Sequence, residues 1–213
     1  ILAVSQGSEE PPKMVVMHYK GNQGGKTLGL IGKGITFDSG GISIKSDSHL
    51  FRMNSDMAGA AAVLGALKAI AVRKIKANII AVMPLAENLP DGRAYKVSDI
   101  IKTFEGKTVE ILSTDAEGRL ILADALSYTR HEGADILIDI ATLTGSIVSA
   151  LGHQTTGIMG SDKNTVRNLI KSGDKAGEML WELPLFPEYK MQIKSDVADL
   201  ENFGGSPAGA ITA

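Results

Sequence analysis

The run Ser113-Thr114-Asp115-Ala116-Glu117-Gly118-Arg119 places two carboxylates and a guanidinium at alternate positions. Residues 108–112 alternate like a strand, and residues 118–131 carry apolar side chains at helical spacing. Polar groups at a strand-to-helix junction lie at the carboxyl edge of a sheet, where α/β proteins build their sites. A carboxylate can also simply favour a helix N-terminus. That explanation accounts for one acidic residue, but not for the further charged residues upstream.

Two more carboxylates occur upstream in glycine-rich settings. Asp38 lies in the run at 32–41, which also contains Lys33. Asp56 stands at the start of an Ala/Gly-rich helix predicted at 55–71, where a carboxylate is usually a cap. Glycine lets the backbone approach a ligand closely, but such loops are often only structural. Each residue taken alone therefore has a structural explanation.

Taken together, Asp38, Asp56, Asp115 and Glu117 are four carboxylates at predicted element ends. Carboxylates that lie close together raise each other's pKa unless cations neutralise them. Two divalent ions about 3.5–4 Å apart can share a bridging carboxylate and activate water. Oxygen ligands suit Mg or Mn, and Zn also accepts carboxylate. The four histidines occur in separate settings and are better explained as surface or structural residues than as ligands.

A second glycine-rich segment, Gly21–Thr27, resembles a phosphate-binding loop. That motif needs a glycine at position 20, which is Lys20 here. The residues that follow are strand-like rather than helical, so no helix N-terminus would face a phosphate. We interpret this segment as a turn.

Composition limits the classes of partner. The chain of 213 residues has a formal charge of -2, which argues against nucleic acid or an anionic membrane as the main partner. It has no cysteine, and hence no disulfide or thiolate metal site. No apolar run reaches the length of a membrane span. The length suffices for one large domain or two small ones.

Strands that alternate with helices predict an α/β fold, a three-layer helix–sheet–helix sandwich with a mixed central sheet. Two strands at 14–20 and 27–31 are expected to form a hairpin around 21–26. The other expected segments are buried strands at 77–84 and 135–140, a helical or turn segment at 97–104, helices at 145–151 and 165–176, and an irregular stretch at 179–187.

The motifs together resemble the leucyl aminopeptidase family, the M17 metallopeptidases. The run at 113–120 is similar to the family signature Asn-Thr-Asp-Ala-Glu-Gly-Arg-Leu, with Ser113 in place of the first Asn. Gly-Lys-Gly-Ile-Thr-Phe-Asp-Ser-Gly-Gly at 32–41, Lys45, the stretch at 53–56 and Ala-Thr-Leu-Thr-Gly at 141–145 match the family in the same order. The resemblance implies a catalytic metallopeptidase domain over residues 14–213, truncated at its C-terminus. Residues 1–13 would be a linker or the end of a preceding element.

The resemblance also implies a role for each matching residue. Two metal ions per subunit, Mn or Zn with Mg as an alternative, would be held by Lys33, Asp38, Asp56, Asp115 and Glu117. Asp38 and Glu117 would bridge the ions, Lys33 and Asp56 would complete the tighter site, and Asp115 the more exchangeable one. Lys45 would polarise the scissile carbonyl, and Arg119 would hold a bicarbonate as general base toward a metal-bound hydroxide. The substrate would contact Met53, Thr142, Leu143 and Gly145.

The activity implied is removal of apolar, leucine-like N-terminal residues from short peptides by a cytoplasmic homo-hexamer. An alternative function, which is not enzymatic, is that of an oligomeric nucleic-acid-binding or regulatory homologue. The charge of -2 and the absence of a basic patch or stacking aromatics weigh against that alternative.

Overall fold

The computed structural model describes residues 1–213, which divide into two compact units. The first unit comprises Ile1–Thr142 and Ser195–Asn202. The second comprises Leu143–Lys194 and Phe203–Ala213. The chain thus returns to the first unit for eight residues before it re-enters the second.

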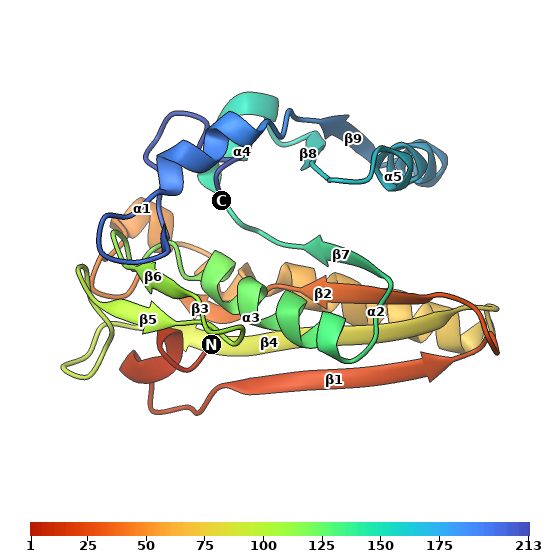
Figure 1. Ribbon diagram of the computed structural model, residues 1–213, viewed down its shortest axis with the longest axis horizontal. Coiled ribbons are helices and arrows are strands. Elements are labelled where there is room, and N and C mark those ends of the chain that lie inside the picture. The colour runs from red at the N-terminus through yellow and green to blue at the C-terminus, as the bar shows by residue number, and fades with distance from the viewer. The chain divides into compact units, whose positions relative to one another are not determined.

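The first unit is built on a five-stranded mixed sheet centred on the long strand β4 (Asn78–Asn88) (Figure 1). Strand β1 (Lys13–Lys20) runs antiparallel along one side of β4. On the other side β2 (Thr27–Gly32) and β3 (Gly34–Asp38) pair with it in succession, both parallel. Strand β7 (Ile136–Ile140) extends the sheet beyond β2, also parallel.

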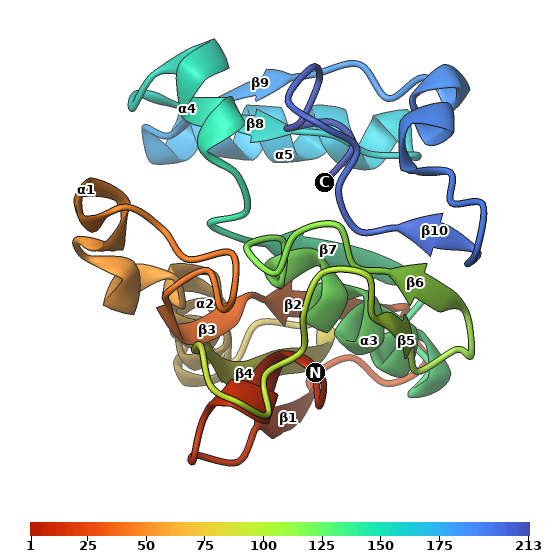
Figure 2. The same cartoon turned by 90° about the vertical axis from the view of Figure 1, so that its left-hand side faces the viewer.

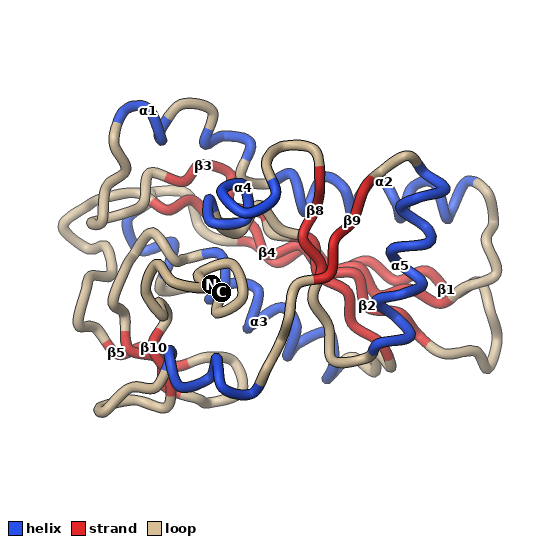
Figure 3. Tube along the Cα trace, turned by 90° about the horizontal axis from the view of Figure 1, so that it is seen from above, coloured by secondary structure: helices blue, strands red, loops and turns tan.

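Helices α2 (Ala58–Val72) and α3 (Gly118–His131) cover opposite faces of this sheet (Figures 1 and 3). Two neighbouring residues of β2, Gly29 and Leu30, show that the helices lie on opposite faces, because successive side chains of a strand point to opposite faces of the sheet. Leu30 belongs to the core cluster that contains residues of α2. A Cβ added at Gly29 would instead meet Thr129 Cγ2 of α3 at 2.6 Å. The α/β class and the helix–sheet–helix layering are confirmed.

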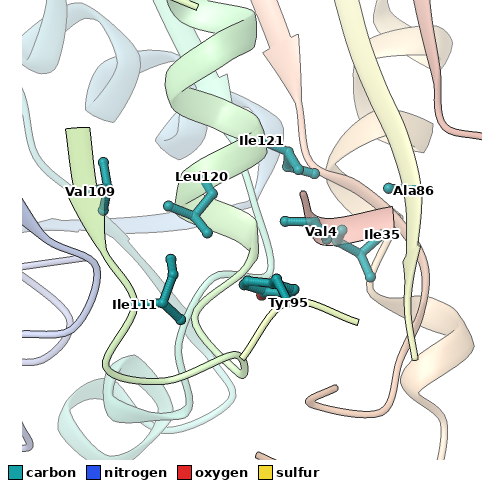
Figure 4. Packing of buried hydrophobic residues seen from close by; sticks show 8 residues of the cluster. All are labelled: Val4, Ile35, Ala86, Tyr95, Val109, Ile111, Leu120 and Ile121. Atoms are coloured by element: carbon teal, nitrogen blue, oxygen red, sulfur yellow. The ribbon is translucent and has the colours of Figure 1, made fainter. Parts of the chain in front are cut away.

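Each helix packs against a separate hydrophobic cluster on its own face of the sheet, so both faces of the sheet are buried. The cluster beneath α2 contains Leu30, Ala60, Val63, Leu67, Ile79, Ala81 and Met83. The cluster beside α3, shown in Figure 4, contains Val4, Ile35, Ala86, Tyr95, Val109, Ile111, Leu120 and Ile121. Val4 comes from a short 3-10 helix, η1 (Val4–Gly7), near the start of the chain.

A second, three-stranded sheet lies in the same unit. Strand β6 (Thr108–Glu110) is its centre, with β5 (Ile100–Lys102) antiparallel on one side. Strand β10 (Leu200–Glu201), from the returning segment, lies parallel on the other side (Figure 2). The helical or turn prediction for residues 97–104 was wrong in part, since β5 lies there. A three-residue strand is too short for alternation to reveal.

The predicted hairpin between β1 and β2 was also wrong. Both strands pair with β4 instead, one on each side of it. The turn between them is held by Asn78 at the start of β4, whose side chain accepts from Asn22 N at 3.0 Å and donates to Gly25 O at 2.9 Å. The turn residues therefore wrap around a third strand, which the local pattern could not indicate.

Strand β7 is less buried than predicted. Ile136 and Ile140 are 36% and 40% exposed. The reason is that β7 is an edge strand, paired with β2 alone.

The second unit contains a parallel pair, β8 (Thr155–Ile158) and β9 (Met179–Glu182), connected through helix α5 (Lys163–Ala176). Asp162 caps α5 by accepting from Thr165 N at 3.0 Å, and Gly177 ends it with φ +78°. The irregular structure predicted for residues 179–187 was wrong in part, since β9 occupies the first four of them. The unit also holds α4 (Gly145–Leu151), at its predicted bounds, and the 3-10 helix η3 (Pro187–Ile193).

One segment, Asp47–Val72, is long and apolar enough by composition to cross a membrane, contrary to the sequence expectation. It consists of helix α1 (Asp47–Leu50), the 3-10 turn η2 (Met53–Ser55) and α2. The 15 residues of α2 span roughly 22 Å at 1.5 Å per residue, against a hydrocarbon core of about 30 Å. Because α2 packs on the sheet through Val63 and Leu67, it is better explained as a core helix.

Candidate metal centre

The charged residues of the glycine-rich motifs all lie at ends of elements in the first unit. Lys33 joins β2 to β3, and Asp38 ends β3. Asp56 follows η2 directly, just before α2. Asp115 lies in the loop after β6, and Glu117 is the N-cap residue of α3. Parallel strands β2 and β3 end on this side of the sheet, where ligand sites of α/β folds form.

One group of contacts is centred on Lys33, whose side chain is only 3% exposed. Its Nζ lies 2.8 Å from Asp56 Oδ2 and 2.9 Å from Glu117 Oε1. The same ammonium donates to the carbonyl oxygen of Thr142 at 3.0 Å. The hydroxyl of Thr142 in turn donates to Asp56 Oδ1 at 2.6 Å. Lys33, Asp56, Glu117 and Thr142 thus form one connected group.

A second group is centred on Lys45. Its Nζ lies 2.8 Å from Asp38 Oδ2 and also contacts Asp115 Oδ1. The two groups meet through Glu117, because oxygen atoms of Asp38, Asp115 and Glu117 all lie within 4.8 Å of one another. Four carboxylates therefore converge, with two ammonium groups between them.

Burial and crowding shift the pKa values in this cluster. Burial raises the pKa of Glu117, which Lys33 counteracts and Asp38 reinforces. Burial likewise raises the pKa of Asp115 despite its contact with Lys45. For Lys33 burial acts to lower the pKa, but the carboxylates of Glu117 and Asp56 outweigh it and raise that pKa. Added positive charge at this point would relieve the repulsion among the acids.

Three buried polar residues to which the sequence analysis gave no role hold the two acidic loops together. Asn88, at the end of β4, donates from Nδ2 to Asp38 Oδ1 and to the carbonyl of Thr114, both at 2.9 Å. Tyr95 donates from its hydroxyl to the same carbonyl at 2.8 Å. The Thr114 hydroxyl donates to Gly40 O at 2.6 Å. Asn88 lies four residues beyond the strand predicted at 77–84, so the available signal was only a polar residue near the carboxyl end of a buried strand.

Arg119 lies in the first turn of α3, and its Nε is buried without a hydrogen-bond partner. Burial lowers the pKa of this guanidinium, and the carboxylate of Glu117 partly offsets the effect. A buried unpaired donor on a cationic group suits an anion such as a carboxylate or bicarbonate. Arg119 therefore fits the role of an anion-binding residue.

The four predicted substrate contacts fall in different units. Met53 opens η2, three residues before Asp56, and Thr142 contacts Asp56 and Lys33 directly. Leu143 and Gly145 belong to the second unit. Their place beside the substrate stays a prediction.

The donor set fits divalent cations. Carboxylate oxygens from Asp38, Asp115 and Glu117 are close enough to share one ion. Glu117 Oε2 is buried without a hydrogen-bond partner, and an ion would satisfy it. Fold and site together describe an α/β protein with a carboxylate-rich centre that suits divalent metal ions.

Comparison with known proteins shows to which family of such α/β proteins the chain belongs. The family model described as "Cytosol aminopeptidase family, catalytic domain" matches residues 1–213. The chain belongs to this family. It is 55% identical over 213 residues to a probable cytosol aminopeptidase of Alkaliphilus metalliredigens, and 52% identical to one of Alkaliphilus oremlandii. Each match covers all of this chain and 43% of the relative, so the chain spans less than half the length of these relatives.

A solved structure agrees with the fold. The bottromycin maturation enzyme BotP in complex with Mn superposes with a TM-score of 0.92 at 38% identity. The match covers 99% of this chain and 48% of BotP. The predicted family resemblance is therefore confirmed.

Proposed function

We propose that these residues form the catalytic domain of a metal-dependent aminopeptidase that removes apolar, leucine-like N-terminal residues from short peptides. The observation that carries the proposal is the convergence of Asp38, Asp56, Asp115 and Glu117 around Lys33 and Lys45. The names of the relatives and the manganese complex of BotP support it.

Two divalent ions would supply a Lewis acid for the scissile carbonyl and would activate the attacking water. Asp38 and Glu117 would hold both ions, Lys33 and Asp56 the tighter one, and Asp115 the more exchangeable one. Lys33 must give up its proton to act as a ligand, because an ammonium has no free electron pair. Its contacts with Asp56 and Glu117 already fix the nitrogen beside the other ligands.

Two cationic residues would act on the substrate rather than hold metal. Lys45 would donate to the carbonyl oxygen, where negative charge develops in the transition state. It reaches Asp38 and Asp115, so its ammonium already lies beside the proposed ligands. Arg119 would hold a bicarbonate through its unpaired Nε, and that anion would supply a base for the water proton.

The residues proposed to contact the substrate are Met53, Thr142, Leu143 and Gly145. The carbonyl of Thr142 accepts a hydrogen bond from Lys33. A substrate that moves Thr142 would therefore also move a ligand of the tighter metal site. We also propose a cytoplasmic homo-hexamer, consistent with the word cytosol in the relatives' names. Light scattering of the full-length protein tests the hexamer.

The test is hydrolysis of a leucine chromogenic amide by the full-length protein after metal removal and titration with Mn²⁺ or Zn²⁺. We expect activity to return as two equivalents bind. Metal binding without turnover would refute the aminopeptidase proposal. A folded protein that binds no metal would refute the site as well.

A matched pair of variants distinguishes loss of a metal ligand from a general effect of removing a carboxylate from α3. Glu117→Gln removes a proposed bridging carboxylate at the N-terminus of the helix. Glu132→Gln makes the same change at its C-terminal end, where the side chain is 37% exposed. We expect loss of metal-dependent activity in Glu117→Gln alone. Equal activity in both variants would contradict the ligand assignment.

A further inference from the structure

Ser195–Asn202 is the segment with which the chain returns to the first unit. It forms hydrogen bonds with residues 108–116, which lead into and include the acidic loop. Ser195 Oγ donates to Glu110 Oε2 at 2.5 Å. The carboxylate of Asp199 accepts from the backbone N and the hydroxyl of Thr108, both at 2.8 Å. Strand β10 then pairs with β6. The segment is thus attached along the whole approach to Asp115.

Its last residue, Asn202, contacts the acidic loop itself. The side chain is buried, with only 2% of the residue exposed. Its Oδ1 accepts from Leu112 N at 2.8 Å and from Ser113 N at 3.3 Å. Its Nδ2 donates to Ser113 O at 2.6 Å and to Ala116 O at 3.4 Å. All four hydrogen-bonding positions of the amide are therefore used on residues 112–116.

We propose that Asn202 is a positioning residue for the metal centre, which fixes the loop that carries Asp115 and Glu117. The inference rests on the proposed function for its consequence in catalysis, but its geometry concerns the loop alone. The carbonyl of Ala116 lies between the two acidic residues, and that of Ser113 lies two residues before Asp115. A side chain that holds both carbonyls fixes the backbone from which both carboxylates project.

The arrangement requires an amide and not merely a polar residue of that size. An aspartate at this position could still accept from the two backbone N–H groups, but it could not donate to the two carbonyls. Its charge would instead face their oxygen atoms in a buried setting, which is unfavourable. The loop must then shift away, and the two carboxylates move with it.

The experiment compares Asn202→Asp with Asp199→Ala in the full-length protein. Asp199→Ala loosens the same segment three residues earlier, but touches Thr108 rather than the acidic loop. Mn²⁺ affinity is measured by titration of the metal-free proteins, and hydrogen exchange of the Leu112 and Ser113 amides reports on the loop without metal. Leucine-amide turnover at saturating Mn²⁺ is recorded separately.

We expect Asn202→Asp to lower Mn²⁺ affinity about 10–100-fold, the range for loss of an outer-shell partner, and to speed exchange of the two amides. Asp199→Ala should keep the wild-type affinity even if it unfolds more easily. Asn202→Ala, which adds no charge, provides a second variant should Asn202→Asp fail to fold. Wild-type Mn²⁺ affinity in either folded Asn202 variant would overturn the inference, as would an equal loss in Asp199→Ala.

The outcomes also separate this inference from the proposed function. A wild-type protein that binds Mn²⁺ but releases no N-terminal residue would refute the aminopeptidase activity. The affinity ratio between wild type and the Asn202 variants would still decide the role of Asn202. A wild-type protein that binds no Mn²⁺ would overturn both.

Discussion

Gly59 provides the sharpest test of the packing beneath the site. It lies in the first turn of α2, where the helix approaches the end of β7. A Cβ added there would lie 2.0 Å from Ile140 O and 2.9 Å from Lys33 N. That carbonyl also accepts the hydrogen bond from Lys33 N at 2.9 Å. Both obstructing atoms are backbone, so no side chain can rotate away.

Gly59→Ala should therefore destabilise the protein despite the better helix propensity of alanine. Forcing an extra methyl group into a packed core costs about 1–3 kcal/mol, and backbone obstruction favours the upper end. The helix propensity gain is about 0.5–1 kcal/mol. The net expectation is a loss of roughly 2 kcal/mol in the free energy of unfolding. Because Ile140 O must move, the Lys33 backbone should move too, and Mn²⁺ affinity should fall.

Gly65→Ala is the matched control, since it makes the same change in the same helix. A Cβ at Gly65 has nothing within 4 Å. The propensity gain is then unopposed, and we expect stabilisation by about 0.5–1 kcal/mol. Urea denaturation of the metal-free full-length variants measures both. Shifts of the same sign in the two variants would refute the reasoning.

Two further predictions concern single contacts. A Cβ at Gly118 would lie 2.5 Å from Lys33 Cε and 2.7 Å from its Nζ. These atoms end a flexible side chain, so Gly118→Ala should change the free energy of unfolding by only about 1 kcal/mol, but it should displace the Lys33 ammonium from Asp56 and Glu117 and weaken Mn²⁺ binding; an unchanged affinity would contradict this. The backbone N–H and hydroxyl of Thr108 lower the pKa of Asp199. That carboxylate therefore stabilises the fold above its unfolded pKa, and the contribution is lost as pH falls through the lower folded value. Carboxyl NMR titration should show the pKa of Asp199 rising toward the ordinary aspartate value in Thr108→Val, which loses the hydroxyl donor, and an unshifted titration would argue against the contact.

Most helices and buried strands could be predicted because their patterns are local. Helix α3 begins and ends at its predicted bounds, since its apolar spacing and flanking loops are contained in its own sequence. The pairing of β1 and β2 could not be predicted, because β4 competes for both from more than 40 residues away along the chain. The short strands β8 and β9 were missed for a related reason. Four residues give little periodicity, and their partner lies across a helix.

The charged members of the site were predictable for a different reason. Carboxylates and lysines in glycine-rich loops are conspicuous, and the family resemblance supplied their order. The neutral residues that hold the charged side chains could not be predicted, because nothing in the local pattern around Asn88 or Tyr95 indicates their partners. Asn202 lies 85 residues after Glu117, and its partners are backbone groups that no side-chain motif reveals.

Thr114 shows why such neutral residues matter to the chemistry. Its backbone N–H donates to the Ser43 hydroxyl, and its own hydroxyl accepts from Ser43 N and donates to Gly40 O, all in the loop after Asp38. Its carbonyl accepts from Asn88 and Tyr95. Asn88 also donates to Asp38, so the two acidic loops share a common set of partners. Carboxylates that lie close together repel one another, and these shared partners fix the backbone of both loops against that repulsion. Lys33 and Lys45 offset the repulsion among the four acids, and the buried neutral network fixes the two loops that carry Asp38 and Asp115, so metal binding at this centre should depend on both.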